Sequence, residues 1–321
     1  MKQFFIRRWF LICLAVVLVA GMTLYEPLAP LASNRRLRES LVAAVLFVMA
    51  LPLEASAMWR SLRRPWAPML AVAVNYGLLP AFTWLVAMFV SDGVAAGLYI
   101  AAATPCTLAS ASVWTRRAGG NDAAAILVTI LTNVSCFVVT PLWLLALTGK
   151  QVSSETLDVR AMIVKLLWLV VLPMAAAQLL RVAAPVRRWA TARKTPLGVS
   201  AQCGVLTMVL FGAIQSGQRL FGADSASVPV RELAEMVVAV AVIHTTMFWV
   251  GFGLAKMLWL RREDQIAVAF AGSQKTLMVG LQVGMELGFT ILPMVTYHVF
   301  QLLIDTIFAD RLRSKGDAKN L

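Results

Sequence analysis

Residues 265–286 read QIAVAFAGSQKTLMVGLQVGME, an apolar stretch of about the length that crosses a lipid bilayer. Its centre carries Gly272-Ser273-Gln274-Lys275-Thr276, and Lys275 lies about ten residues from either end. A lysine near the end of a membrane helix can extend its ammonium group to the lipid headgroups, but from the middle this is difficult. Lys275 therefore predicts an internal cavity or an anionic partner. A purely structural ion pair with Glu54 or Asp305 is the alternative.

The whole sequence shares this apolar character. Hydrophobic residues make up 60% of the 321 residues, charged residues only 14%, and the mean hydropathy is +0.77. A soluble domain carries about 25% charged residues, so this chain has too little polar surface to coat a globule in water. Continuous apolar runs without two-residue alternation favour helices over a barrel. We predict an all-α polytopic membrane protein with ten transmembrane helices, at residues 9–28, 39–58, 66–90, 94–115, 123–148, 160–182, 196–217, 232–258, 265–286 and 288–309.

The distribution of basic residues predicts how these helices are oriented. The net charge is +13, a value also found in nucleic-acid-binding proteins. With ten spans and an inside N-terminus, however, 20 of the 29 Lys and Arg residues fall on the cytoplasmic side and 8 on the opposite side, with Lys275 inside a span. This bias favours two cytoplasmic termini and a lipid bilayer as the partner, with no nucleic acid.

The predicted spans divide into two halves, residues 1–155 and 156–321, with five spans in each. An odd number of spans per half inserts the second half upside down relative to the first, which is the inverted-repeat plan of many secondary transporters. At an offset of 169 residues, Thr107-Leu108 coincides with Thr276-Leu277, and Asn75 coincides with His244. We therefore predict two inverted five-helix repeats.

A second polar interruption lies in the fourth span, at the counterpart of the interruption in the ninth. The sequence there reads Thr104-Pro105-Cys106-Thr107-Leu108-Ala109-Ser110-Ala111-Ser112. Proline removes a backbone donor and clashes with the preceding turn, and the nearby hydroxyl groups can satisfy the freed carbonyls or a ligand. We predict that helices 4 and 9 are broken. A kinked but continuous helix with packed serine and threonine is the alternative.

Other polar side chains at membrane depth are expected to surround the two interruptions. Asn75 lies on the third span and His244 on the eighth, and the fifth span carries Thr129, Thr132 and Asn133 at helical spacing. His244 is either a member of a proton relay or a hydrogen-bonding residue between helices. On the tenth span His298, Gln301 and Asp305 share one face, which we expect to point inward. The candidate substrate- or ion-binding residues are Asn75, Thr104, Thr107, Ser110, Ser112, Thr129, Thr132, Asn133, His244, Ser273, Gln274, Lys275 and Thr276.

These motifs resemble the bile acid:sodium symporter family over nearly the whole chain. The resemblance rests on Asn75 five residues before Pro80, on the Thr104–Ser112 stretch followed by Gly120-Asn121-Asp122-Ala123 and the polar residues of the fifth span, and on Gly272-Ser273-Gln274-Lys275-Thr276-Leu277. The last pattern is similar to the divergent branch that includes bacterial proteins and sodium/bile acid cotransporter 7. The resemblance implies panel and core domains, crossing helices 4 and 9, amphipathic organic anions as substrates, and two Na⁺ ions behind the crossing.

The sodium ligands implied by the resemblance are only partly present. Ser112 and Gln274 match, but Val113 stands in place of an asparagine and Phe270 in place of a glutamate. The methionine and asparagine that flank the glutamine are replaced by Ser273 and Lys275. Losing the glutamate removes negative charge and Lys275 adds a fixed cation. Our hypothesis is that the Lys275 ammonium group occupies part of the sodium space, so that transport is sodium-independent, with H⁺ coupled through this lysine as the suggested coupling ion.

A weaker form of this hypothesis keeps one Na⁺ near Thr129, Thr132, Asn133 and Gln274. No cofactor other than Na⁺ or H⁺ as coupling ion is expected, and an enzyme is not expected. With two histidines and no HExxH, GxSxG or acidic metal cluster, the chain lacks recognisable catalytic groups.

The sequence as a whole favours a secondary active transporter of a small or amphipathic organic anion, working by alternating access. We expect it in the bacterial inner membrane, as a monomer or a homodimer. A non-transporting regulator or scaffold of the same fold and an ion channel are the alternative functions.

Overall fold

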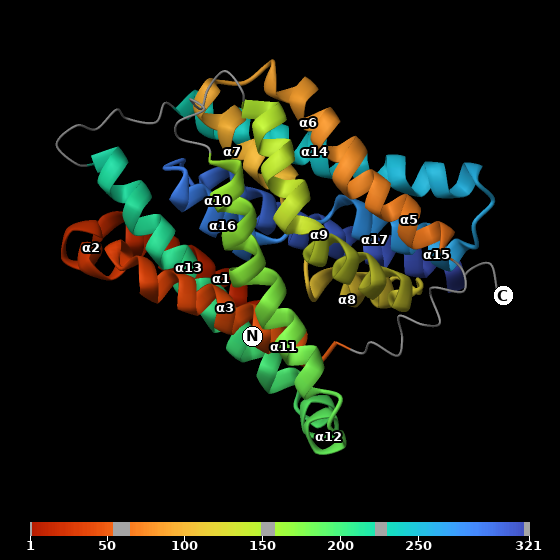
Figure 1. Cartoon of the computed structure of the whole chain (residues 1–321). Coiled ribbons are helices and arrows are strands. Elements are labelled where there is room, and N and C mark those ends of the chain that lie inside the picture. Colours follow the sequence, from red (N-terminus) through yellow and green to blue (C-terminus); the bar gives the residue numbers. More distant parts are fainter. Residues whose placement is uncertain (1, 54–64, 149–157, 222–229, 318–321) are drawn as a thin grey trace.

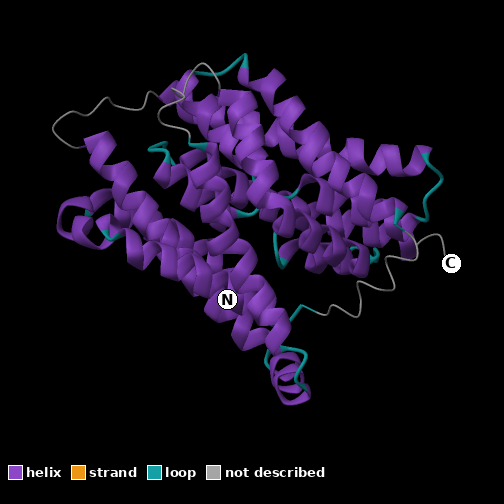
Figure 2. Cartoon of the chain, viewed as in Figure 1, coloured by secondary structure: helices purple, strands orange, loops and turns teal. Residues whose placement is uncertain are grey.

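The computed structural model describes residues 2–53, 65–148, 158–221 and 230–317 (Figure 1). Within these ranges all regular structure is helical, as Figure 2 shows. Seven helical segments of the described chain are long and apolar enough to cross a membrane, or eight if a bent pair near the N-terminus counts as one span. The prediction of a polytopic all-α protein is therefore confirmed, whereas the total of ten spans stays a prediction.

The bent pair shortens the first predicted span. Helix α1 (Lys2–Thr23) ends five residues before residue 28, and α2 (Tyr25–Ser33) leaves it at an angle of 102°. The Tyr25 hydroxyl donates to the main-chain oxygen of Phe221 at 3.0 Å, which fixes α2 against the end of another helix. Helix α3 (Arg35–Ala50) follows, capped by the Asn34 side chain. The second predicted span continues to residue 58, and residues 54–58 lie outside the described residues.

Two spans contain a turn of π-helix just before a proline. The third consists of α5 (Trp66–Ala73), η1 (Val74–Leu78) and α6 (Leu79–Ala87), with Pro80 at the start of α6. The sixth consists of α10 (Val159–Leu166), η2 (Leu167–Val171) and α11 (Leu172–Leu180), with Pro173 in the same place. Proline has no N–H, so the carbonyls one turn earlier lose their α-helical donors and the helix widens locally. In η1 the widened turn contains Asn75.

Both interruptions predicted from the sequence are real breaks. Helix α7 (Asp92–Ala103) and α8 (Ser110–Arg117) are separated by the non-helical residues 104–109. Helix α15 (Arg262–Ser273) and α16 (Leu277–Glu286) are separated by Gln274–Thr276. The alternative of a kinked but continuous helix in the fourth span is therefore wrong. The two breaks touch, because the Thr276 N–H donates to the Pro105 carbonyl at 2.9 Å.

The remaining helices are α9 (Asp122–Thr148), α12 (Ala184–Ala192), α13 (Lys194–Phe221), α14 (Val230–Met257) and α17 (Leu292–Asp317). The helices pack in two groups (Figure 1). In the first group, α1, α2 and α3 pack on α13, and α11 packs on α3. In the second group, α15 packs against α5, α8, α9 and α14, and α17 packs against α7, α8 and α14. Helix α16 contacts both groups, through α3 and α13 on one side and α7 and α17 on the other.

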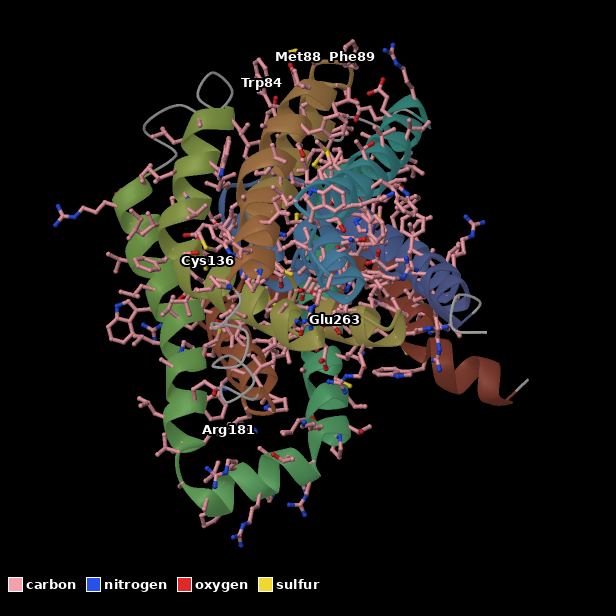
Figure 3. The ribbon with its side chains drawn as sticks, turned by 90° about the vertical axis from the view of Figure 1, so that its right-hand side faces the viewer. Trp84, Met88, Phe89, Cys136, Arg181 and Glu263 are labelled. Carbon is pink, nitrogen blue, oxygen red and sulfur yellow. The ribbon has the colours of Figure 1, made fainter. Side chains whose placement is uncertain are left out.

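Small residues allow the close packing that a membrane interior needs. A Cβ atom on Gly97 of α7 would lie only 2.4 Å from the ring of Pro293 in α17, so glycine is what lets these helices meet. Large apolar side chains point outward instead. Figure 3 shows Trp84, Met88 and Phe89 at the end of α6, where Phe89 is 83% exposed. Aromatic side chains in this position are typical of a membrane–water interface.

Candidate binding site at the helix breaks

The first break is held open by side chains of α9. The main-chain N–H of Cys106 donates to Thr132 Oγ1 at 3.2 Å, and Asn133 Nδ2 donates to the Cys106 carbonyl at 2.9 Å. Thr129 Oγ1 donates to the Thr107 carbonyl at 2.9 Å. Buried backbone groups outside a helix must find such partners. The polar residues predicted on the fifth span therefore stabilise the unwound backbone.

The second break is held in the same way by α17. Gln301 Oε1 accepts from the main-chain N–H of Lys275 at 2.9 Å, and Gln301 Nε2 donates to the Lys275 carbonyl at 3.0 Å. The Tyr297 hydroxyl donates to the Ser273 carbonyl at 2.9 Å. From η1, Asn75 Nδ2 donates to the Gln274 carbonyl at 2.9 Å. Each break is thus recognised through its backbone by a neighbouring continuous helix.

The side chain of Lys275 lies in a cage of carbonyl oxygens. Its Nζ donates to the main-chain oxygen of Asn75 at 2.7 Å, to Asn75 Oδ1 at 3.0 Å and to the Thr104 carbonyl at 2.8 Å. The Tyr76 ring centroid is 5.3 Å from Nζ, a cation–π distance. Lys275 is only 1% exposed. The ammonium group is therefore held by fixed dipoles and an aromatic face.

Pro80 explains why an oxygen is available for Lys275. In η1 the N–H of Leu79 bonds to the Val74 carbonyl, and Pro80 has no N–H to offer. The Asn75 carbonyl is left without a helical donor, and Lys275 takes the position. The neighbouring Tyr76 carbonyl is freed as well and accepts from Trp143 Nε1 at 2.6 Å.

No carboxylate pairs with Lys275 among the residues that the structure describes. Asp305, proposed as its structural partner, is occupied elsewhere: its Oδ1 lies 2.9 Å from His244 Nε2, and its Oδ2 accepts from Gln274 Nε2 at 2.5 Å. The alternative of a Lys275–Asp305 ion pair is therefore wrong. The other proposed partner, Glu54, lies outside the described residues.

Gln274 connects this buried cluster to the first break. Its Oε1 accepts hydrogen bonds from Thr107 Oγ1 and Ser110 Oγ, both at 2.8 Å, while its Nε2 faces Asp305. Two hydroxyl donors on one end and a carboxyl oxygen on the other assign the orientation of the amide. Gln274 therefore connects the Asp305 carboxyl group by hydrogen bonds to the α7–α8 break.

A cavity of about 420 Å³ lies between the two groups of helices and reaches the breaks. From the breaks Thr107 and Thr276 line it, the first turn of α8 adds Ser110 and Ser112, and α17 adds His298. The first group contributes apolar side chains, among them Phe10, Met49 and Val205, while Arg116, Asp122 and Lys194 lie where the cavity meets the expected cytoplasmic side. Such a mixture of apolar walls and a few polar groups is typical of a small-molecule site. Another hollow, between α6 and α14, contains none of the candidate residues.

The opposite end of the molecule carries an ion-pair network between the two groups. Lys165 of α10 lies 2.8 Å from Glu39 of α3 and 2.5 Å from Glu286 at the end of α16. Arg35 pairs with Glu39 at 2.8 Å. Helix α15 begins beside the loop after α8, where Asn121 bonds to Asp264, so Glu286 lies on the far side of the break from the cavity mouth. This network, which we call the outer ion pairs, ties α16 to the first group.

Nearly all of the candidate residues share this hydrogen-bonded network. Ser112 is the exception, because its hydroxyl bonds only within its own turn, to the Ala109 carbonyl at 3.1 Å, although it lines the cavity. Residues outside the candidate set also contribute, among them Tyr76, Tyr297, Gln301 and Asp305. The shared helical face of Gln301 and Asp305 was a usable signal for two of them. Tyr76 had no signal beyond its position next to Asn75.

Three of the four side-chain oxygens of the candidate sodium site already make hydrogen bonds. Thr132 Oγ1 donates to Val128 and accepts from Cys106, Thr129 Oγ1 donates to Thr107, and Gln274 Oε1 accepts two protons. Asn133 Oδ1 is buried without a partner in the described structure. A hydroxyl group that donates its proton keeps lone pairs that can bind a cation, so one Na⁺ near these residues stays a prediction, whereas the Lys275 ammonium group already has an oxygen shell.

Comparison with known proteins shows similarity to transporters along almost the whole chain. The model of the SBF-like CPA transporter family matches residues 8–314. Sodium/bile acid cotransporter 7-B of Xenopus laevis is 24% identical over 330 residues, which cover 96% of this chain and 92% of that protein. Sodium/bile acid cotransporter 7 of Rattus norvegicus is 23% identical over 332 residues, with 96% and 93% covered. An uncharacterized protein of Pseudomonas aeruginosa is 27% identical over 261 residues, with 78% and 72% covered.

Proposed function

Because the chain belongs to the SBF-like CPA transporter family, we propose that it is a secondary active transporter that carries an organic anion by alternating access. Membership confirms the resemblance to bile acid:sodium symporters expected from the sequence. The observation that carries the proposal is the contact of two helix breaks beside a cavity between two groups of helices. Broken helices at the membrane midplane are how many transporters build a binding site.

An amphipathic anion fits this cavity best. Its walls are mostly apolar, and Arg116 and Lys194 bring cationic groups to the side where the cavity opens. The Arg116 guanidinium also pairs with Asp122. The relatives are named sodium/bile acid cotransporters, and a bile acid has this combination of a large apolar body and one anionic group.

The structure also supports the proposal of two inverted repeats, residues 1–155 and 156–321. At the offset of 169 residues, α7 corresponds to α15, α8 to α16, and α9 to α17. The same offset relates Cys106 to Lys275. The backbone N–H and carbonyl of Cys106 bond to Thr132 and Asn133, and those of Lys275 bond to Gln301, the residue equivalent to Thr132. Ten spans, two cytoplasmic termini and a bacterial inner membrane complete this proposal, with the first helix group as panel and the second as core.

Transport is proposed to be independent of sodium. The Lys275 ammonium group has three carbonyl ligands and an aromatic face, the kind of environment that a monovalent cation would otherwise take. The ammonium group thus supplies the positive charge that a bound Na⁺ would bring to the crossing. Lys275 acts here as a positioning residue that joins η1 to both breaks.

Uptake by the purified full-length chain in proteoliposomes tests the proposal. Radiolabelled taurocholate serves as the amphipathic probe, with succinate as a small dianionic comparison, each measured in sodium and in choline buffer. We expect saturable taurocholate uptake of equal rate in both buffers. Uptake no faster than in empty liposomes for both probes would contradict organic-anion transport, and uptake that requires sodium would contradict the role assigned to Lys275.

A further inference from the structure

His244 and Asp305 form a buried titratable pair at membrane depth. His244 lies in the middle of α14 and Asp305 in the middle of α17, and both are 0% exposed. His244 Nε2 is 2.9 Å from Asp305 Oδ1. Ionisable side chains at this depth are costly, and in membrane proteins they mark ion or proton pathways.

The contacts of the imidazole determine how many protons the pair holds. Its Nε2 faces Asp305 Oδ1, and its Nδ1 lies 3.3 Å from the Ser273 carbonyl oxygen. A neutral imidazole has one N–H and one lone pair, so beside an ionised Asp305 one ring nitrogen would direct its lone pair at an oxygen. One more proton on the pair places a hydrogen in both contacts, so no lone pair faces another. Either the ring is an imidazolium that donates from both nitrogens, or Asp305 is protonated and donates to Nε2 while Nδ1–H donates to Ser273.

We infer that the His244–Asp305 pair is the proton-binding site of this transporter, that it binds one proton in the conformation described above, and that it releases this proton in another conformation. The inference rests on the proposed transport function. The step is a simple proton transfer: one O–H bond of a hydronium ion breaks, one N–H or O–H bond forms on the pair, and a water molecule is left. The proton adds one positive charge to the pair.

The surroundings of the pair explain how this proton would be coupled to an anion. Lys275 already provides one positive charge, which the ionised Asp305 balances when the pair is unprotonated. Protonation leaves the region with a net charge of about +1, which favours an anion in the adjacent cavity. One proton and one monovalent anion would therefore cross together without net charge movement.

Gln274 is the physical link between proton and cavity. Asp305 Oδ2 accepts from Gln274 Nε2, and Gln274 Oε1 accepts from Ser110, whose side chain lines the cavity. The imidazole also contacts the last carbonyl of α15, at Ser273. Loss of the proton would set a lone pair against that carbonyl and push the end of α15 away from α14. Release of the proton would therefore move the backbone at the α15–α16 break.

Within the described part of the chain, few other titratable groups face the pair. The Tyr297 ring lies edge-on to His244 with centroids 5.8 Å apart, and its hydroxyl bonds to Ser273. Lys275 follows Gln274, with Tyr76 against its ammonium group. Four other titratable side chains of the packed helices bond elsewhere: His298 to Gln301, Asp264 to Asn121, Glu235 to Ser91 and Asp310 to Arg117. Other charged groups on these helices, such as Glu232 and Lys256 of α14, lie toward the helix ends.

Infrared difference spectra between pH 5 and pH 9 test the site without any substrate. They are recorded on the full chain in liposomes, for wild type, H244Q, D305N and two controls. Because the chain has only two histidines, H298Q leaves His244 as the sole imidazole. D310N removes an exposed carboxylate that pairs with Arg117. We expect an imidazole or carboxyl signal in wild type, H298Q and D310N that is lost in both H244Q and D305N.

The same signal in wild type and in both pair variants would overturn the inference. If D305N fails to fold, as judged by gel filtration, H244Q alone decides. Taurocholate uptake gives the second measurement: an inward proton gradient should raise accumulation several-fold in wild type, whereas H244Q should exchange taurocholate without responding to the gradient. Uptake that ignores the gradient in wild type would also overturn the inference. If taurocholate is not carried at all, transport of this probe fails and the infrared comparison decides the proton site by itself.

Discussion

The ammonium group of Lys275 lies 2.7 Å from the main-chain oxygen of Asn75, a residue 200 positions earlier in the chain. This contact joins a widened turn of the third span to the break of the ninth. It exists because Pro80 deprives the Asn75 carbonyl of a helical donor and because the ninth span carries a lysine where its helix is interrupted. The carbonyl that Pro80 leaves free and the buried ammonium group of Lys275 therefore satisfy each other's hydrogen bonding.

Replacing Lys275 with alanine should leave the carbonyl cage empty and create a cation site. We expect K275A to unfold several degrees below wild type, because buried acceptors without donors cost about 1–3 kcal/mol each. Sodium chloride, compared with choline chloride, should raise the midpoint of K275A but not that of wild type. Thermal unfolding in detergent measures both effects. K256A, at an exposed lysine of α14, is the matched control and should behave as wild type. An equal response of K275A to both salts would contradict the prediction that the empty carbonyl cage binds Na⁺.

Truncating Gln301 should destabilise the protein because it removes both backbone bonds to Lys275. Asn133 serves the equivalent backbone at Cys106. We expect Q301A and N133A each to lower the free energy of unfolding by about 2–3 kcal/mol, with Q301A the more severe. Equilibrium unfolding in mixed detergent micelles measures this. Q202A, at the cavity wall, is the control, and an unfolding free energy of Q301A equal to that of Q202A would show that the break does not need Gln301.

Two serines of the same cavity allow a matched comparison. Ser110 donates to Gln274, whereas Ser112 bonds only to Ala109 in its own turn. We expect S110A to reduce kcat/KM for taurocholate about tenfold, the effect of losing roughly 1.4 kcal/mol, and S112A to change it less than twofold. Initial uptake rates in proteoliposomes provide the measurement. A larger loss in S112A than in S110A would mean that the serines act through direct substrate contact rather than through Gln274.

Neutralising Glu286 should loosen the outer ion pairs. Glu286 of α16 pairs with Lys165 of α10 and lies 4.0 Å from Arg35 of α3 in the first helix group. In E286Q we expect a cysteine introduced at the buried Gln282 to react several-fold faster with a membrane-impermeant thiol reagent, in a background without the four native cysteines. High salt should have the same effect on the parent, since it screens partly exposed pairs. The D310N variant breaks an ion pair within the second helix group and should not change the labelling.

Much of this arrangement could be predicted from the sequence, and the reasons are local. Pro105 and the run Gly272–Thr276 each disrupt helical hydrogen bonding within a few residues, so the local sequence is enough to predict both breaks. The position of Asn75 five residues before Pro80 was also visible, and the structure gives its physical meaning. The sharp turn after Thr23 and the helix at Ala184–Ala192 were not predicted, because apolar continuity conceals a turn and short polar helices resemble loops.

The partners of Lys275 and Asp305 could not be predicted, because they depend on distance in space. Asp305 was an available carboxylate, and charge alone favoured its pairing with Lys275. In the structure His244 and Gln274 take both of its oxygens, and carbonyl dipoles hold the lysine instead. Which of several polar groups meet in the membrane interior is decided by the packing of the helices.

The span formed by α15 and α16 is the least apolar of the seven candidate spans in the described part of the chain, and its central 18-residue stretch is buried throughout. Lipid alone is therefore a poor environment for it. A ribosome delivers the N-terminal segments first, so α5, α8, α9 and α14, which surround α15, have already been made when it emerges. For this segment, entering the bilayer and completing the tertiary structure are the same step. We therefore expect that, during biogenesis of the transporter, the helices made earlier leave a space between them that this later, more polar span then occupies.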